Sequence, residues 1–129
     1  MNPLRIAPTD ETPTVNFIPA DGRLEISGNS YPENSTKFYT PVLDWLRQFA
    51  VETSGKKITM DFNFDYFNTS SAKYILEILR IIQDCKKNGN ECLIRWHFLE
   101  EDTDMQEAGE DYRDSIDLEF EFVVREDTL

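Results

Sequence analysis

The sequence has few of the residues from which catalytic and metal sites are usually assembled. It contains two cysteines, one histidine and five scattered glycines in 129 residues. Two cysteines cannot form a disulfide framework, and scattered glycines cannot form a loop that cradles phosphate groups. One histidine without a Gly-x-Ser-x-Gly motif argues against a hydrolase triad. These absences favour a binding protein over an enzyme, and we expect no catalytic residue, cofactor or metal.

Basic residues are also scarce. Lysine and arginine number 13 against 25 acidic residues, which gives a formal net charge of −12. Nucleic acids and anionic membrane surfaces both require clustered basic side chains. No apolar run approaches the roughly 20 residues that span a bilayer. The N-terminal stretch MNPLRIAPTDE also lacks the apolar core of a signal peptide. We therefore expect a cytoplasmic protein that binds neither nucleic acid nor membranes.

The chain is rich enough in apolar residues to form one core. It is 40% hydrophobic and 12% aromatic, and no repeat or linker divides it, so we expect a single domain over residues 1–129. Three prolines (Pro3, Pro8 and Pro13) without any apolar periodicity predict a loosely ordered arm over residues 1–13.

The most informative stretch is Ile58–Ile82. Apolar side chains alternate from Ile58 to Phe64, which predicts a strand, and they recur at helical spacing up to Cys85, which predicts a helix. Between the two elements lie Asn68, Thr69, Ser70 and Ser71. A helix start needs one capping oxygen, and this turn offers four.

The other elements follow from similar patterns. We expect a hairpin of residues 15–18 and 24–26 around the Pro19–Gly22 turn, a helix through residues 38–49, a strand over 91–99, a short helix between 100 and 115, and a last strand over 118–124. In that last strand the inward-facing residues are Leu118, Phe120, Phe122 and Val124. Pro41 belongs in a first turn, which favours Thr40 as the cap of the first helix, with Ser35 or Thr36 as the alternatives.

The resulting order, β-β-α-β-α-β-α-β, indicates an α/β protein. Strands that are buried on both faces read as continuous apolar runs, whereas the last three strands here alternate. We therefore predict a two-layer fold, with a mixed sheet of about five strands and the helices mainly on one face.

Two polar groupings invite a chemical interpretation. Cys85, Cys92 and His97 suggest zinc, but both cysteines lie on apolar faces and no Cys-x-x-Cys pair exists, so we interpret them as core cysteines. Carboxylates of the sheet form the second grouping, comprising Asp61, Asp65, Glu119 and Glu121. Together with His97 they could form the site of a small-molecule-binding protein or an enzyme, which is the alternative function. A solvated acidic face is the simpler interpretation.

The Asn68–Ser71 turn also has two interpretations. One is simple capping, which contributes about 1 kcal/mol. The other is phosphorylation of one hydroxyl, on Thr69, Ser70 or Ser71. A phosphate adds roughly −1.5 to −2 charges, and the free N–H groups of a helix start accept it without unfolding. The two interpretations are compatible, because one residue can cap the helix while its neighbour is modified.

The sequence resembles a known family. A strand that runs into Asn68-Thr69-Ser70-Ser71 and a helix is similar to the STAS domains of anti-sigma factor antagonists. The similarity is closer to the SiaC family of bacterial regulatory phosphoproteins and covers nearly the whole chain. The similar segments are Gly28–Ser35, Asp44-Trp45, Tyr66–Ser71 and Ile94–Trp96.

The resemblance implies a function. Thr69 would be the phosphoacceptor of a bacterial signalling phosphoprotein, modified by a serine/threonine protein kinase and restored by a PP2C-type phosphatase. The unphosphorylated form would bind a target protein, in several systems a diguanylate cyclase that makes cyclic di-GMP, and phosphorylation would release it.

The segment Tyr31–Ser35 has two interpretations as well. It either ends the hairpin and caps the first helix, or it places Tyr31, Glu33 and Asn34 beside Asn68 and Thr69 as part of a partner-binding surface. The second interpretation requires the two segments to lie at the same edge of the sheet.

Overall fold

The computed structural model describes residues 1–126, which form one six-stranded sheet and three α-helices. The strands are β1 (Leu4–Ile6), β2 (Thr14–Ile18), β3 (Arg23–Ser30), β4 (Lys57–Phe67), β5 (Glu91–Leu99) and β6 (Glu119–Arg125). The helices are α1 (Ser35–Glu52), α2 (Thr69–Lys87) and α3 (Thr103–Ser115), with a 3₁₀ turn η1 (Pro19–Asp21) between β2 and β3.

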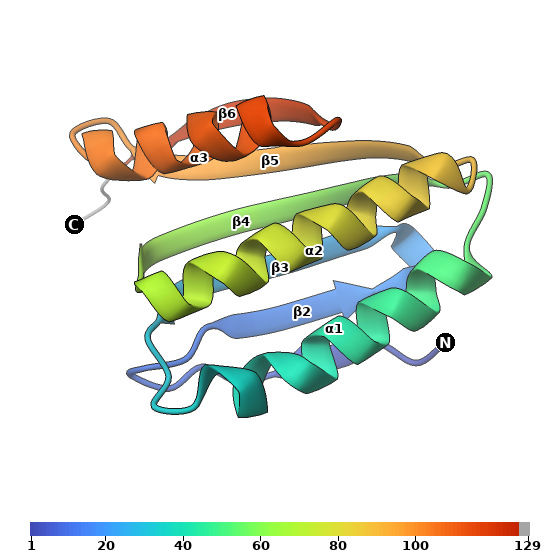
Figure 1. The fold of residues 1–129 in the computed structure, drawn as a ribbon, viewed down its shortest axis with the longest axis horizontal. Coiled ribbons are helices and arrows are strands. Elements are labelled where there is room, and N and C mark those ends of the chain that lie inside the picture. The colour runs from blue at the N-terminus through green and yellow to red at the C-terminus, as the bar shows by residue number, and fades with distance from the viewer. Residues whose placement is uncertain (127–129) are drawn as a thin grey trace.

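The strands lie in the sheet in the order in which they occur in the chain. β1, β2 and β3 pair antiparallel, and β3 to β6 pair parallel. Because parallel strands are joined by right-handed crossovers, successive crossovers in one direction place their helices on the same face. Figure 1 shows α1, α2 and α3 together in front of the sheet. This confirms the predicted two-layer α/β fold.

The sheet has one strand more than the about five that the sequence patterns predicted. Residues Leu4–Ile6 form β1, which pairs with Val15–Phe17 of β2. The ring N–H of Trp45 also donates to the Asn2 carbonyl at 2.9 Å. Within the expected loosely ordered arm of residues 1–13, Leu4–Ile6 is therefore docked on the sheet. A three-residue strand is too short to show the alternation on which strand prediction depends.

The start of α1 also differs from the prediction. The Asn34 side chain accepts a hydrogen bond from the Lys37 N–H at 3.0 Å, so the cap is neither Thr40 nor the alternatives Ser35 and Thr36. Pro41 lies inside the helix. It is exposed, so water can reach the carbonyl that the missing proline N–H leaves without a partner.

Trp96 is the largest fully buried side chain and organises the core around β5. Its ring N–H donates to the Met105 carbonyl at 2.9 Å, which attaches α3 to the sheet. Gly109 of α3 lies directly on the ring, and a methyl group at that position would come within 2.5 Å of it. A glycine inside a helix is unfavourable by itself, so this close approach explains its presence.

The outer strand β6 is less covered than predicted. Leu118 is buried, and Phe120 and Phe122 are partly buried against the core, but Val124 is 53% exposed. Val124 pairs with Phe98 and lies on the face predicted for it, but no element of the described chain covers it near the end of the edge strand β6. Within residues 1–126, no helix has both the length and the apolar character needed to cross a membrane.

We expect Gly109→Ala to destabilise the protein, although alanine is the better helix former. The added methyl group would overlap the Trp96 ring, and overpacking a core costs typically 1–3 kcal/mol. Urea unfolding followed by Trp fluorescence measures the change. Glu107→Ala, an exposed substitution in the same helix, is the control. An unchanged or higher stability of Gly109→Ala would contradict the close packing.

Candidate functional site

The ends of β3 and β4 bring together the two segments that the sequence analysis singled out. Ser30 pairs with Phe67 in the parallel register, and the Asn68 N–H donates to the Ser30 carbonyl at 3.0 Å. The segments Ser30–Ser35 and Tyr66–Ser71, which we call the Thr69 edge, therefore lie side by side. Figure 1 shows α1 and α2 both beginning at this edge of the sheet.

A β-bulge shapes the Thr69 edge. Gly28 pairs with Phe64 and Asn29 pairs with Tyr66, so Asp65 is an extra residue in β4. The bulge reverses the alternation of the strand, because Phe67 packs against the core while Tyr66 is 54% exposed. The Tyr66 ring meets the Tyr31 ring edge to face, with centroids 6.0 Å apart. The sequence pattern gave no sign of the bulge.

Two asparagines cap the neighbouring helices in the same way. The Asn34 side chain caps α1, and the Asn68 side chain accepts from the Ser71 N–H of α2 at 2.9 Å. Both capped helix starts lie at the Thr69 edge. Of the four polar residues in the Asn68–Ser71 turn, Asn68 is the one that caps α2.

Three buried hydroxyls connect the elements beneath the edge. The Ser71 hydroxyl donates to the Ser30 carbonyl at 3.0 Å and lies 2.8 Å from the Ser30 hydroxyl. The Ser30 hydroxyl in turn lies 2.6 Å from the hydroxyl of Tyr39. Since each hydroxyl has one proton, Tyr39 donates to Ser30 and Ser30 donates to Ser71. Burial raises the pKa of Tyr39, so it keeps the proton that it donates.

A second set of hydroxyl contacts is exposed. The Ser35 and Ser70 hydroxyls lie 2.6 Å apart, and the Thr36 and Tyr74 hydroxyls are separated by the same distance. These contacts join the first turn of α1 to the first two turns of α2. Ser70 also donates to the Asn68 side chain at 3.1 Å.

Thr69 differs from its two neighbours. It is the first residue of α2 and is exposed, and its hydroxyl makes no hydrogen bond within residues 1–126. Ser71 is fully buried, and Ser70 is held by Ser35 and Asn68. Among the three hydroxyls of the turn, Thr69 is thus the one that is exposed and makes no hydrogen bond within residues 1–126.

On the opposite face of the sheet, which no helix of residues 1–126 covers, most charged side chains are paired with one another. Asp61 is 5% exposed and accepts from Arg95 at 3.1 Å and from His97 at 2.7 Å. Arg95 also bonds Glu121. Two further pairs join Arg125 to Asp65 and to Asn63.

This pairing disfavours the alternative of a carboxylate site on the sheet. Asp61 and Asp65 line different hollows. The carboxylates that the sequence placed on one face therefore act mainly as partners of arginine and histidine.

The cysteines are core residues, as predicted. Cys85 and Cys92 are both buried, and burial raises the pKa of Cys85 to about 12 and that of Cys92 to about 11. Thiols with such pKa values remain protonated near neutral pH and are poor metal ligands and nucleophiles. Within residues 1–126 no cluster of three or more potential metal ligands occurs.

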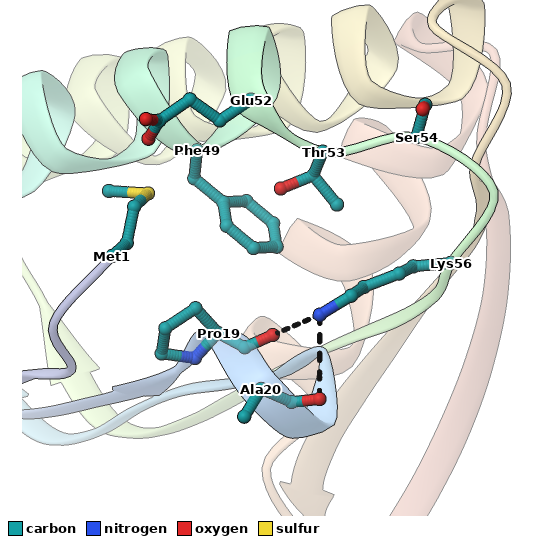
Figure 2. Close-up of a pocket in the computed structure, with 8 residues that line it drawn as sticks. All are labelled: Met1, Pro19, Ala20, Phe49, Glu52, Thr53, Ser54 and Lys56. Carbon is teal, nitrogen blue, oxygen red and sulfur yellow. Dashed lines mark hydrogen bonds between the residues drawn. The ribbon is translucent and has the colours of Figure 1, made fainter.

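A separate pocket lies at the far end of α1, away from Thr69. Figure 2 shows Lys56 at its wall, with the amine donating to the carbonyls of Pro19 and Ala20 at 2.9 and 3.4 Å. The pocket has a volume of about 480 Å³ and one carboxylate, Glu52. The Lys56 amine is hydrogen-bonded to two backbone carbonyls, so we do not take this pocket as the candidate site.

The fold and the Thr69 edge together describe a two-layer α/β protein that presents polar and aromatic groups at one edge of its sheet. The SiaC family model, described as a family of regulatory phosphoproteins, matches residues 6–125. The chain belongs to the SiaC family.

Individual relatives agree with this assignment. An uncharacterised protein of Pseudomonas aeruginosa strain UCBPP-PA14 is 31% identical over 125 residues and covers 97% of each chain. The crystal structure of apo-SiaC from P. aeruginosa is 30% identical, covering 96% of this chain and 100% of that chain, with a TM-score of 0.86. A chain in the crystal structure of the diguanylate cyclase SiaD in complex with its activator SiaC, also from P. aeruginosa, is 30% identical over 95% of this chain and 99% of that chain, with a TM-score of 0.87.

We expect Ser71→Ala to destabilise the protein by about 1–3 kcal/mol, because the buried Ser30 hydroxyl loses its acceptor and the Ser30 carbonyl loses one of its two donors. Thr69→Ala, two positions away on the same turn, should change the stability by less than about 0.5 kcal/mol. Thermal unfolding of both variants measures the difference. Equal effects of the two substitutions would show that the buried hydroxyls do not hold the edge.

Proposed function

We propose that this protein is a non-catalytic bacterial signalling module whose binding to a diguanylate cyclase is switched by reversible phosphorylation of Thr69. The observation that carries the proposal is the position of Thr69 at the start of α2, where its exposed hydroxyl makes no hydrogen bond within residues 1–126 while the neighbouring Asn68, Ser70 and Ser71 are hydrogen-bonded. Family membership supports it, because SiaC proteins are regulatory phosphoproteins and one of them forms a complex with a cyclase.

The physical effect of the phosphate follows from its place. It would add roughly −1.5 to −2 charges beside the free N–H groups of the first turn of α2, which accept an anion without unfolding. Ser71 and Asn68 fix that turn from beneath, so the charge would change the surface rather than the fold. An unpaired dianion is costly to enclose in an interface, and binding would weaken.

Two further proteins belong to this proposal. A serine/threonine kinase would phosphorylate Thr69 in the cytoplasm, and a PP2C-type phosphatase would remove the phosphate. Both enzymes would approach a single domain at the same exposed edge, since Ser71 is buried beneath it.

The contact surface would include the residues around Thr69. Tyr31 is 38% exposed, Glu33 and Asn34 are exposed, and Asn68 lies next to Thr69. The contacts between the two segments place these four residues at the edge that the phosphate would alter.

We expect the unphosphorylated protein and Thr69→Ala to retain a diguanylate cyclase from a lysate of the native host, identified by mass spectrometry. Thr69→Asp should lose most of it, because the carboxylate adds charge at the same place. With the purified cyclase, calorimetry should show at least about tenfold weaker binding for Thr69→Asp, or ~1.4 kcal/mol.

Ser54→Asp is the matched control, since Ser54 is exposed at the other end of the sheet (Figure 2) and gains the same charge. It should bind like the wild type. The proposal is wrong if no cyclase is retained by any form, or if Thr69→Asp and the protein phosphorylated at Thr69 both bind as tightly as Thr69→Ala.

A further inference from the structure

A hollow of about 320 Å³ lies between the end of β4 and the start of α3. Its apolar lining comes from Tyr66, Phe67, Met105 and Ala108. Phe67 is only two residues before Thr69, and the Tyr112 hydroxyl of α3 donates to the Ala72 carbonyl of α2 at 2.8 Å. The hollow therefore adjoins the Thr69 edge, and we call it the Tyr66 hollow.

The Tyr66 ring is exposed for a structural reason. The bulge at Asp65 turns this aromatic side chain away from the core, where a regular strand would have placed it. Tyr31, also exposed, packs edge to face against it. Exposed tyrosines supply large contact area with little loss of side-chain entropy, and they are enriched in protein interfaces.

The rim of the hollow is acidic. Asp65, Asp102 and Asp104 line it. Arg125 pairs with Asp65 at 3.0 Å, whereas within residues 1–126 neither Asp102 nor Asp104 has a lysine or arginine partner. Asp102 accepts the Met105 N–H as the cap of α3, and Asp104 is exposed. Two carboxylates thus remain without a countercharge around an apolar floor.

We propose that the Tyr66 hollow receives a lysine or arginine side chain of the protein partner that binds the Thr69 edge. Such side chains lay an apolar stem on hydrophobic surface and keep the charged head in a polar environment. Here Phe67, Met105 and Ala108 contact the stem, while Asp102 and Asp104 bind the head. The Tyr66 ring adds a face on which a cation is stabilised.

This inference extends the proposed function and rests on it in one respect, the identification of the partner as a cyclase. It is also compatible with release by phosphorylation. A basic side chain that is seated between Asp102 and Asp104 is already neutralised, so a phosphate on Thr69 would enter the same interface without a countercharge.

The direct test needs no cyclase. N-acetyl-arginine amide is titrated into the ¹⁵N-labelled protein, with N-acetyl-norleucine amide as the uncharged probe of similar stem length. We expect millimolar binding of the arginine probe with shifts concentrated at Tyr66, Phe67 and residues 104–108, and much smaller shifts with norleucine. Asp104→Arg should abolish the arginine shifts, and its own spectrum reports whether it is folded.

Three outcomes would overturn the inference. Equal shifts with both probes would make the hollow a general apolar site. Shifts at these residues on raising the protein concentration without a probe would make it a contact between two copies. An absence of localised shifts would mean that the hollow binds no basic side chain.

The cyclase then separates this inference from the proposed function. Asp104→Arg should weaken cyclase binding by about tenfold, and added salt should weaken wild-type binding, as expected for a charge pair at the solvent-exposed rim of an interface. Asp21→Arg, the same change at the exposed η1 turn, should bind like the wild type. A normal affinity of Asp104→Arg with loss in Thr69→Asp would reject the hollow alone, and the reverse would reject the Thr69 switch alone.

Discussion

The buried hydrogen-bonded hydroxyls of Ser30, Tyr39 and Ser71 are the contact on which the Thr69 edge depends. They come from β3, α1 and α2, so they join a strand and two helices by side-chain hydrogen bonds. Each group would be costly to bury without a partner, so the network requires all three elements to be in place. The position of Thr69 follows, because its turn is attached to β3 through Ser71 from below.

The same arrangement separates the parts of the edge that are fixed from those that can change. Asn34 and Asn68 satisfy the helix starts, and Ser35 and Ser70 join them at the surface. The Thr69 hydroxyl is left outside this network. A charge added there acts on an ordered surface that includes the exposed rings of Tyr31 and Tyr66. In the proposed switch, the fold would provide the support, and the chemistry of the Thr69 side chain would determine what the surface binds.

Most of the fold was predictable because it rests on local patterns. Alternation predicted β4 and β5, and helical spacing predicted α2. The missed features depend on contacts between distant residues. β1 exists because β2 pairs with it, Gly109 is required by Trp96, and the exposure of Tyr66 results from a bulge in the pairing of β3 with β4.

For the candidate site, the sequence indicated the turn and the neighbouring Tyr31–Ser35 segment. Neither the burial of Ser71 nor the pairing of Asp61 with Arg95 and His97 was visible from local pattern.

The most direct test of a surface switch on a fixed fold is the ¹⁵N spectrum of the protein phosphorylated stoichiometrically at Thr69. Shift changes confined to the Thr69 edge and the first turn of α2, with Trp96 and Tyr39 unchanged, are expected. Changes throughout the core would contradict the account, because phosphorylation would then act by altering the fold.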